Sequence, residues 1–348
     1  PDPGPLQVHK FGGTCVSAAD RIAGVSDLMA AELDKRGPGA RAAVVVSAMG
    51  AHPSSPVKVT DLLLAVVARA SARDPGYAAD LAALRAKHVD VADELLGAGA
   101  ARDAFVASLD ADVADLKAVL QAITIAGLAS GSFSDYVVGH GELWCARLFT
   151  AVLRARGVDA ATLDAREVVI VTPTPDGASV DVEYEASEAA LDAWAGASAA
   201  NGGGTTTGDG VARVVVVTGF VARTLDGAPT TLKRNGSDYS ATIVGALTRA
   251  AKITIWTDVD GVFSADPRKV ADAVCLSSLS YLEAWELAYF GASVLHPRTT
   301  QPAMRAGIPV RGGEMREQRA VCRRRRRPGS PRTRACRRRS RSCWWRPP

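Results

Sequence analysis

The feature that most constrains the fold is a repeated alternation between short β-branched runs and longer Ala/Leu-rich stretches. The short runs are typical of buried strands and lie at residues 7–11, 42–47, 167–171, 211–218 and 252–257. Helical patterns separate them, at residues 20–35, 61–72, 77–96, 110–125, 141–156 and 239–250. This order predicts an α/β fold whose mainly parallel sheet is covered by helices on both faces. Ligands of such folds bind at the carboxyl ends of strands, so we expect the chemistry in the turns that follow the strands.

The composition agrees with a folded, water-soluble domain. Of the 348 residues, 47% are hydrophobic and 22% are charged, which excludes a largely disordered chain, a collagen-like repeat and a small disulfide scaffold. No apolar run reaches the roughly 18 residues of a membrane-spanning helix, so we expect no membrane association. The chain begins at Pro1 without a signal-like segment, and we expect any targeting peptide to be cleaved or to precede this sequence.

The charge is divided unevenly along the chain. Residues 311–348 hold fifteen Arg, no Lys and two acids, a local charge of +13, whereas residues 1–310 keep 26 of the 41 basic and 35 of the 37 acidic residues, a charge of −9. An Arg cluster of this kind suggests a nucleic-acid-binding arm. Its Arg, Pro, Gly, Cys and Trp content is also typical of a reading-frame or gene-model error, which is the interpretation that we favour. We therefore expect residues 311–348 to be disordered or artefactual, and nucleic acid not to be a partner.

The first motif is the turn after the first expected strand. Lys10 lies near the end of this strand, and Gly12 and Gly13 let backbone N–H groups approach an anion closely. A tight turn beside an exposed lysine is the alternative interpretation. The chain contains no G-x-x-x-x-G-K-[ST] and no G-x-G-x-x-G, so neither a P-loop nor a standard dinucleotide fold has its main sequence support.

Three further motifs hold charged residues beside glycines. Residues 232–240 (LKRNGSDYS) place two cations before a helix that Ser237 or Asp238 would cap. This mixture of opposite charges suits a zwitterionic substrate. Residues 256–268 (WTDVDGVFSADPR) indicate either an acidic surface turn or a nucleotide pocket, and residues 139–142 (GHGE) place a carboxylate at the expected start of a helix. His140 is expected to be a structural hydrogen-bonding residue. The loops at 50–56 and 201–210 are expected to be exposed spacers.

Together, and in this order, these motifs resemble the aspartate kinases of the amino-acid-kinase family over residues 6–310. KFGGT at 10–14, SAM at 47–49, KVTD at 58–61 and GHGE at 139–142 carry the resemblance, and so do TLKRNGSDYSA at 231–241, WTDVDGVFSADPR at 256–268 and SYLEAWELAYFGASVLHPRT at 280–299. The longest motifs look most like the kinase part of plant or algal bifunctional aspartokinase–homoserine dehydrogenases. Cys15, Phe263 and Ser293 depart from the family pattern without removing a principal catalytic charge.

The resemblance implies a three-layer αβα fold and transfer of the γ-phosphoryl group of ATP, with Mg²⁺ carried by ATP, to the β-carboxylate of L-aspartate. It implies that Lys10 and Asp238 are catalytic. The aspartate side would be formed by Ser47, Thr60, Glu142, Phe220, Arg234 and Ser237, and the nucleotide side by Lys10, Gly12, Gly13, Thr257, Asp258, Phe263 and Arg268. A chloroplast location and a homo-oligomeric full-length protein are further expectations. Another amino-acid kinase, acting on glutamate, N-acetylglutamate or UMP, and an inactive fragment with a nucleic-acid-binding tail remain the alternatives.

Overall fold

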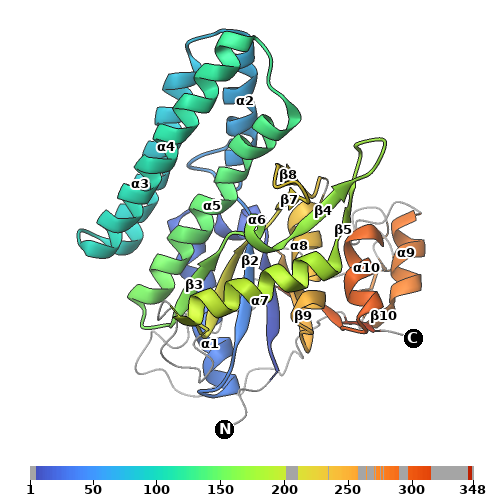
Figure 1. Cartoon of the computed structure of the whole chain (residues 1–348). Coiled ribbons are helices and arrows are strands. Elements are labelled where there is room, and N and C mark those ends of the chain that lie inside the picture. Colours follow the sequence, from blue (N-terminus) through green and yellow to red (C-terminus); the bar gives the residue numbers. More distant parts are fainter. Residues whose placement is uncertain are drawn as a thin grey trace.

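The computed structural model describes residues 5–200, 211–233, 235–257, 264, 270, 272–274, 276, 278–289, 297–314 and 344–346, and Figure 1 shows their arrangement. The strands are β1 (Gln7–Phe11), β2 (Ala42–Val46), β3 (Ala160–Leu163), β4 (Ile170–Pro173), β5 (Val180–Val182), β6 (Val214–Thr218), β7 (Val221–Thr224), β8 (Pro229–Thr231), β9 (Lys252–Thr257), β10 (Ser278–Ser280), β11 (Val310–Glu314) and β12 (Trp344–Arg346). The helices are η1 (Gly13–Val16), α1 (Ala19–Arg36), α2 (Val59–Ser71), α3 (Tyr77–Leu96), α4 (Ala100–Ala126), α5 (Gly131–Ala155), α6 (Ala165–Val168), α7 (Tyr184–Ala200), α8 (Gly236–Leu247), α9 (Tyr281–Tyr289) and α10 (Pro297–Arg305).

A large sheet with the order β10-β12-β11-β9-β1-β2-β6-β3 forms the centre of the molecule. The strands from β11 to β3 pair in parallel, and β12 runs antiparallel to β11. A smaller sheet with the order β5-β4-β7-β8 lies beside it. Because β1 and β2 lie between other strands and are buried, they carry the nearly continuous apolar runs that the sequence shows.

Each face of the large sheet packs against its own layer of helices. Successive residues of β2 point to opposite faces, so Val44 and Val46 join the apolar cluster under α1 to α5, whereas Ala43 and Val45 join the cluster that includes α8 and α10. The predicted three-layer αβα fold with a mainly parallel sheet is thereby confirmed. In Figure 1, α2, α3, α4 and the first part of α5 extend beyond the sheet. None of the helices in the described ranges combines the length and the apolar character needed to cross a bilayer.

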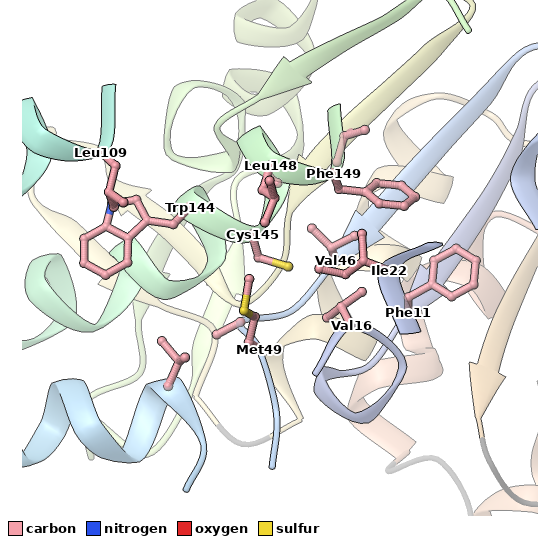
Figure 2. Close-up of a cluster of buried hydrophobic side chains, with 14 of the residues drawn as sticks. Phe11, Val16, Ile22, Val46, Met49, Leu109, Trp144, Cys145, Leu148 and Phe149 are labelled. Carbon is pink, nitrogen blue, oxygen red and sulfur yellow. The ribbon is translucent and has the colours of Figure 1, made fainter. Parts of the chain in front are cut away.

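The core beneath α5 holds this helix firmly against the sheet. Figure 2 shows Cys145 and Phe149 of α5 close to Val46 and Met49, with Trp144 on the side that faces α4. Trp144 is fully buried, and its indole Nε1 donates to Asp112 Oδ2 on α4 at 3.0 Å. A buried aromatic side chain whose polar atom is hydrogen-bonded holds its helix firmly in position. The position of α5 matters because it carries the GHGE motif.

Several sequence predictions require correction. The strand expected at 167–171 is instead the short helix α6 followed by β4. The cause is Asp164, whose side chain accepts from the Arg166 amide at 3.0 Å and starts the helix. Helix α4 starts ten residues earlier than expected, at Ala100, whereas α8 starts earlier and ends earlier than the expected 239–250.

The start of α5 is the correction with the largest consequence. This helix begins at Gly131, after Ser130, whose hydroxyl accepts from the Phe133 amide at 3.2 Å, and not at residue 141. A Cβ atom on Gly141 would lie 2.9 Å from the Ala48 Cβ. The glycine therefore serves close packing of the helix on the loop after β2, and it does not mark a helix end.

The chain after residue 309 adds strands to the same sheet. β11 continues the parallel pairing to Glu314, four residues past the expected domain boundary at 310. β12 lies between β10 and β11. That the Arg-rich segment comes from a reading-frame or gene-model error stays a prediction. The loop at 201–210 lies outside the described residues. The loop at 50–56 is partly ordered by a pair of backbone hydrogen bonds of 2.9 and 2.8 Å between His52 and Ser55.

Candidate functional site

A cavity of about 410 Å³ lies at the carboxyl ends of β1, β2 and β6, where the sequence places its motifs. Its wall is polar, with glycine, hydroxyl, carboxyl and ammonium groups from six segments of the chain. The lining residues are Gly13, Thr14, Ser47, Ala48, Met49, Gly50, Lys58, Thr60, Asp61, Glu142, Phe220, Lys233, Asn235, Gly236 and Ser237. All five of the predicted aspartate-side residues that the structure describes therefore line one cavity, namely Ser47, Thr60, Glu142, Phe220 and Ser237.

The turn after β1 lies at one side of this cavity. Gly13 packs against Gly50 so closely that a Cβ atom on Gly50 would lie 2.5 Å from the Gly13 carbonyl carbon. The Gly50 amide donates to the Gly13 carbonyl at 2.9 Å, which ties the first turn to the loop after β2. Only glycine allows two backbones to approach to this extent.

Lys10 and Asp238 form an ion pair beside the first turn. The Lys10 Nζ lies 2.6 Å from Asp238 Oδ1, and the two side chains are 10% and 19% exposed. Lys10 is held in the central strand β1 between Val45 and Ile255, whereas Asp238 lies in the first turn of α8. A largely buried ammonium that is paired with a carboxylate from a different element is well placed to bind a second anion.

Glu142 is the most strongly perturbed acid of the cavity. Its side chain is buried, its Oε1 accepts from the Ala48 amide at 3.2 Å, and its Oε2 is buried without a partner among the described residues. Burial raises the pKa of Glu142 to about 8, because leaving water disfavours the charged form. Since Glu142 lies in the middle of α5, the prediction that it lies at the start of a helix is wrong.

The turns around the start of α8 have unusual backbone conformations. Phe220, Lys233 and Asn235 adopt positive φ angles of 69°, 61° and 57°, which non-glycine residues rarely do. The Phe220 amide donates to the Ser240 hydroxyl at 2.8 Å, which holds this turn against α8. The helix begins after Asn235 without a side-chain cap, so the prediction that Ser237 or Asp238 caps it is wrong. Strained backbone of this kind clusters at functional sites.

Lys233 is paired with a residue that sequence reasoning missed. Its Nζ donates to Asp135 Oδ2 at 3.1 Å, and the hydroxyls of Thr230 and Thr231 donate to the same carboxylate at 3.2 and 3.4 Å. Asp135 lies in the first part of α5, 98 residues away in sequence from Lys233. No local signal in the sequence indicates this pairing.

The remaining predicted residues have different outcomes. Thr257 ends β9, the neighbour of β1, and Gly12 lies next to Lys10, so both are close to the first turn. Arg234, Asp258, Phe263 and Arg268 lie outside the described residues. His140 is confirmed as a structural residue, because it is buried and its Nδ1 donates to the Tyr136 carbonyl at 2.8 Å.

Two further lining residues were not predicted as site residues. Lys58 and Asp61 line the cavity at the start of α2, and the KVTD segment at 58–61 was the signal that pointed to them.

Comparisons with known proteins agree with this geometry. The amino acid kinase family matches residues 5–311. Bifunctional aspartokinase/homoserine dehydrogenase 1, chloroplastic, from Zea mays is 48% identical over 304 residues, which cover 87% of this chain and 30% of the maize protein. Lysine-sensitive aspartokinase 3 from Escherichia coli is 32% identical over 90% of this chain and 63% of its own length.

Solved structures are similar too. The crystal structure of E. coli aspartokinase III in complex with aspartate and ADP has a TM-score of 0.72 and 29% identity, over 90% of this chain and 63% of that chain. The chain thus spans about a third of the length of the plant relatives. With a family match that extends over nearly all of β1 to β11 and a polar cavity at the strand ends, the chain belongs to the amino acid kinase family.

Proposed function

We propose that the chain transfers the γ-phosphoryl group of ATP to the β-carboxylate of L-aspartate, which gives 4-phospho-L-aspartate and ADP. The observation that carries this proposal is the cavity at the strand ends, in which four hydroxyl-bearing residues accompany Glu142, whose buried Oε2 has no partner among the described residues. The aspartokinase names of the relatives, and the aspartate and ADP bound to the E. coli enzyme, support the choice of substrates.

The aspartate would bind in the 410 Å³ cavity. Its ammonium group would donate to Glu142 Oε2, and its carboxylates would accept from the hydroxyls of Ser47 and Thr60. The charged segment before α8 supplies one more cation, Arg234, which we assign to the α-carboxylate because an arginine holds a carboxylate with two hydrogen bonds. This arrangement would match each charge of the zwitterion with its opposite.

The phosphoryl transfer would need charge neutralisation more than proton transfer. A β-carboxylate oxygen is already ionised at neutral pH, so it attacks the γ-phosphorus directly while the bond to the β,γ-bridging oxygen breaks and ADP leaves with that electron pair. Lys10 would neutralise the negative charge on the transferring group, and Asp238 would hold the Lys10 ammonium in place. The backbone of Gly12 and Gly13 would approach the phosphates.

Magnesium would enter as the ATP complex, held mainly by phosphate oxygens, as is usual for this ion. The donor set fits, because the Asp238 carboxylate offers oxygen, the ligand type that Mg²⁺ prefers, beside Lys10. We assign Thr257, Asp258, Phe263 and Arg268 to the nucleotide side. We also propose that the catalytic domain extends from residue 6 past the expected boundary at 310 to the end of β11 at Glu314, and that the Arg-rich segment after it does not take part in catalysis.

The wider setting is proposed from the relatives. The plant relatives are named chloroplastic and bifunctional, so we assign this chain to chloroplasts and to the first step of aspartate-derived amino-acid synthesis. That step would precede the formation of lysine, threonine, methionine and isoleucine. We assign a homo-oligomer to the full-length protein.

The test measures ADP release by the purified chain with aspartate, glutamate, N-acetylglutamate and UMP as separate acceptors. Of these four acceptors, we expect only aspartate to give ADP release. Asp238→Asn should lower kcat by at least about a hundredfold, whereas Asp103→Asn, at an exposed position of α4, should leave it unchanged. A preference for another acceptor, or equal kcat values for the two variants, would refute the assignment.

A further inference from the structure

A second, larger cavity lies apart from the one that holds Glu142. Its volume is about 580 Å³, and it lies between one face of α3, the segment that leads into α1, the loop at 52–55 and the start of α2. It shares no lining residue with the first cavity. The proposed function uses none of its residues.

The α3 wall of this cavity contains an ammonium group that is not hydrogen-bonded to any residue that the structure describes. The Nζ of Lys87 is buried and has no hydrogen-bond partner among the described residues. Burial lowers the pKa of Lys87, because the charged form loses its hydration. An ammonium that is removed from water without an acceptor is unfavourable, so this position favours a ligand that brings an anionic group.

The same wall offers carboxylates to a cationic group. Asp90 lies one turn beyond Lys87 on α3, and Glu94 lies one turn further on the same face. Neither of these acids forms a hydrogen bond or an ion pair with any residue that the structure describes, whereas Asp80 is paired with Arg69 at 3.2 Å. A small molecule with one carboxylate and one ammonium group could therefore pair its carboxylate with Lys87 and its ammonium with one of these acids.

The remaining wall is suited to a small apolar side chain. Leu62 and Val91, together with alanines of α1 and α3, supply apolar surface, and Ser17 and Ser55 add hydroxyl groups to the lining. The loop at 52–55 is held as a wall, because His52 and Ser55 exchange backbone hydrogen bonds and His52 Nε2 lies 3.7 Å from an Asp20 carboxylate oxygen. The loop that the sequence presents as a spacer is therefore an ordered side of this cavity.

We propose that this cavity binds a free amino acid with a small apolar side chain, whose carboxylate pairs with Lys87 and whose ammonium pairs with Asp90. The binding would be independent of phosphoryl transfer. It would join the 52–55 loop to α3, and this loop connects Ala48, the donor to Glu142, with Thr60.

Calorimetric titration of the whole chain tests the proposal, with saturating aspartate present to fill the other cavity. The probes are L-leucine, 4-methylpentanoate, which lacks the ammonium group, and 3-methylbutylamine, which lacks the carboxylate. We expect leucine to bind and each analogue to bind at least about tenfold more weakly, because each leaves one charge of the cavity unmatched.

Lys87→Met keeps the length of the side chain and removes its charge, and it should weaken leucine binding at least about tenfold. The matched control is Lys117→Met, at an exposed position of α4, which should leave binding unchanged. The proposal is overturned if leucine does not bind, if the analogues bind as tightly, or if Lys87→Met binds leucine like the unmodified chain.

Discussion

Relative to the unmodified chain, Glu142→Gln should gain stability in the ligand-free state as the pH rises. Burial raises the pKa of Glu142 to about 8 from an ordinary value of 4.5. Between these two pH values the folded chain keeps a proton that the unfolded chain has released, so the stability contributed by this group falls as the pH rises. Glutamine has the same shape and stays neutral, and its Oε1 can accept from the Ala48 amide as Glu142 does.

The magnitude follows from the same pKa values. Each pH unit within the window changes the free energy of unfolding by about 1.4 kcal/mol. The raised pKa of Glu142 therefore lowers the free energy of unfolding by about 3 kcal/mol at pH 7, where the folded chain keeps the proton, and by about 5 kcal/mol above pH 8. The amide group of glutamine would leave its own N–H unpaired at the position of Oε2, at a cost of about 1–3 kcal/mol. That cost does not depend on pH, so the slope with pH is the diagnostic quantity.

Urea unfolding at pH 5, 7 and 8.5, followed by tryptophan fluorescence without aspartate, measures this slope. The free energy of unfolding of Glu142→Gln minus that of the unmodified chain should rise by several kcal/mol from the lowest to the highest pH. Glu185→Gln, an exposed glutamate in the first turn of α7, should show a constant difference. A constant difference for Glu142→Gln as well would refute the reasoning.

Three further outcomes are expected. Aspartate binding should release a proton, because the ammonium group favours ionised Glu142, so the KM for aspartate should fall as the pH rises from 6 to 8 in steady-state assays. Gly50→Ala should lower the melting temperature by several degrees, since its Cβ would lie 2.5 Å from Gly13. Arg213→Ala should cost about 2 kcal/mol in urea unfolding, because Arg213 donates to carbonyls at the end of α1, including Gly37 at 2.8 Å.

The elements that the sequence predicts best are those whose pattern is set by local burial. β1 and β9 match their predicted bounds, and α3 matches the predicted helix at 77–96. Strands buried on both faces need continuous apolar residues, and a long helix needs a repeating apolar face. Because such strands are parallel, their carboxyl ends meet at one edge. This is why motifs far apart in sequence, such as those at Ser47 and Ser237, line one cavity.

The features that sequence reasoning missed depend on contacts between distant segments. The early start of α5 escaped prediction because Gly139 and Gly141 resemble helix breakers, while in the fold they provide close packing against Val221 and Ala48. The Asp135–Lys233 pair likewise joins α5 to the segment before α8. Periodicity carries no information about either contact, since both arise only after the sheet and its helices have packed.

Glu142 and Lys87 illustrate opposite uses of burial. Burial makes the ionised form of Glu142 unfavourable unless a cationic group binds beside its carboxylate. A ligand that brings an ammonium compensates for the lost hydration of the carboxylate, whereas a ligand without one leaves the acid protonated. Selectivity for a zwitterion can thus come from a destabilised carboxylate as much as from the number of hydrogen bonds. Lys87 has the complementary requirement, because its buried ammonium favours a ligand with an anionic group.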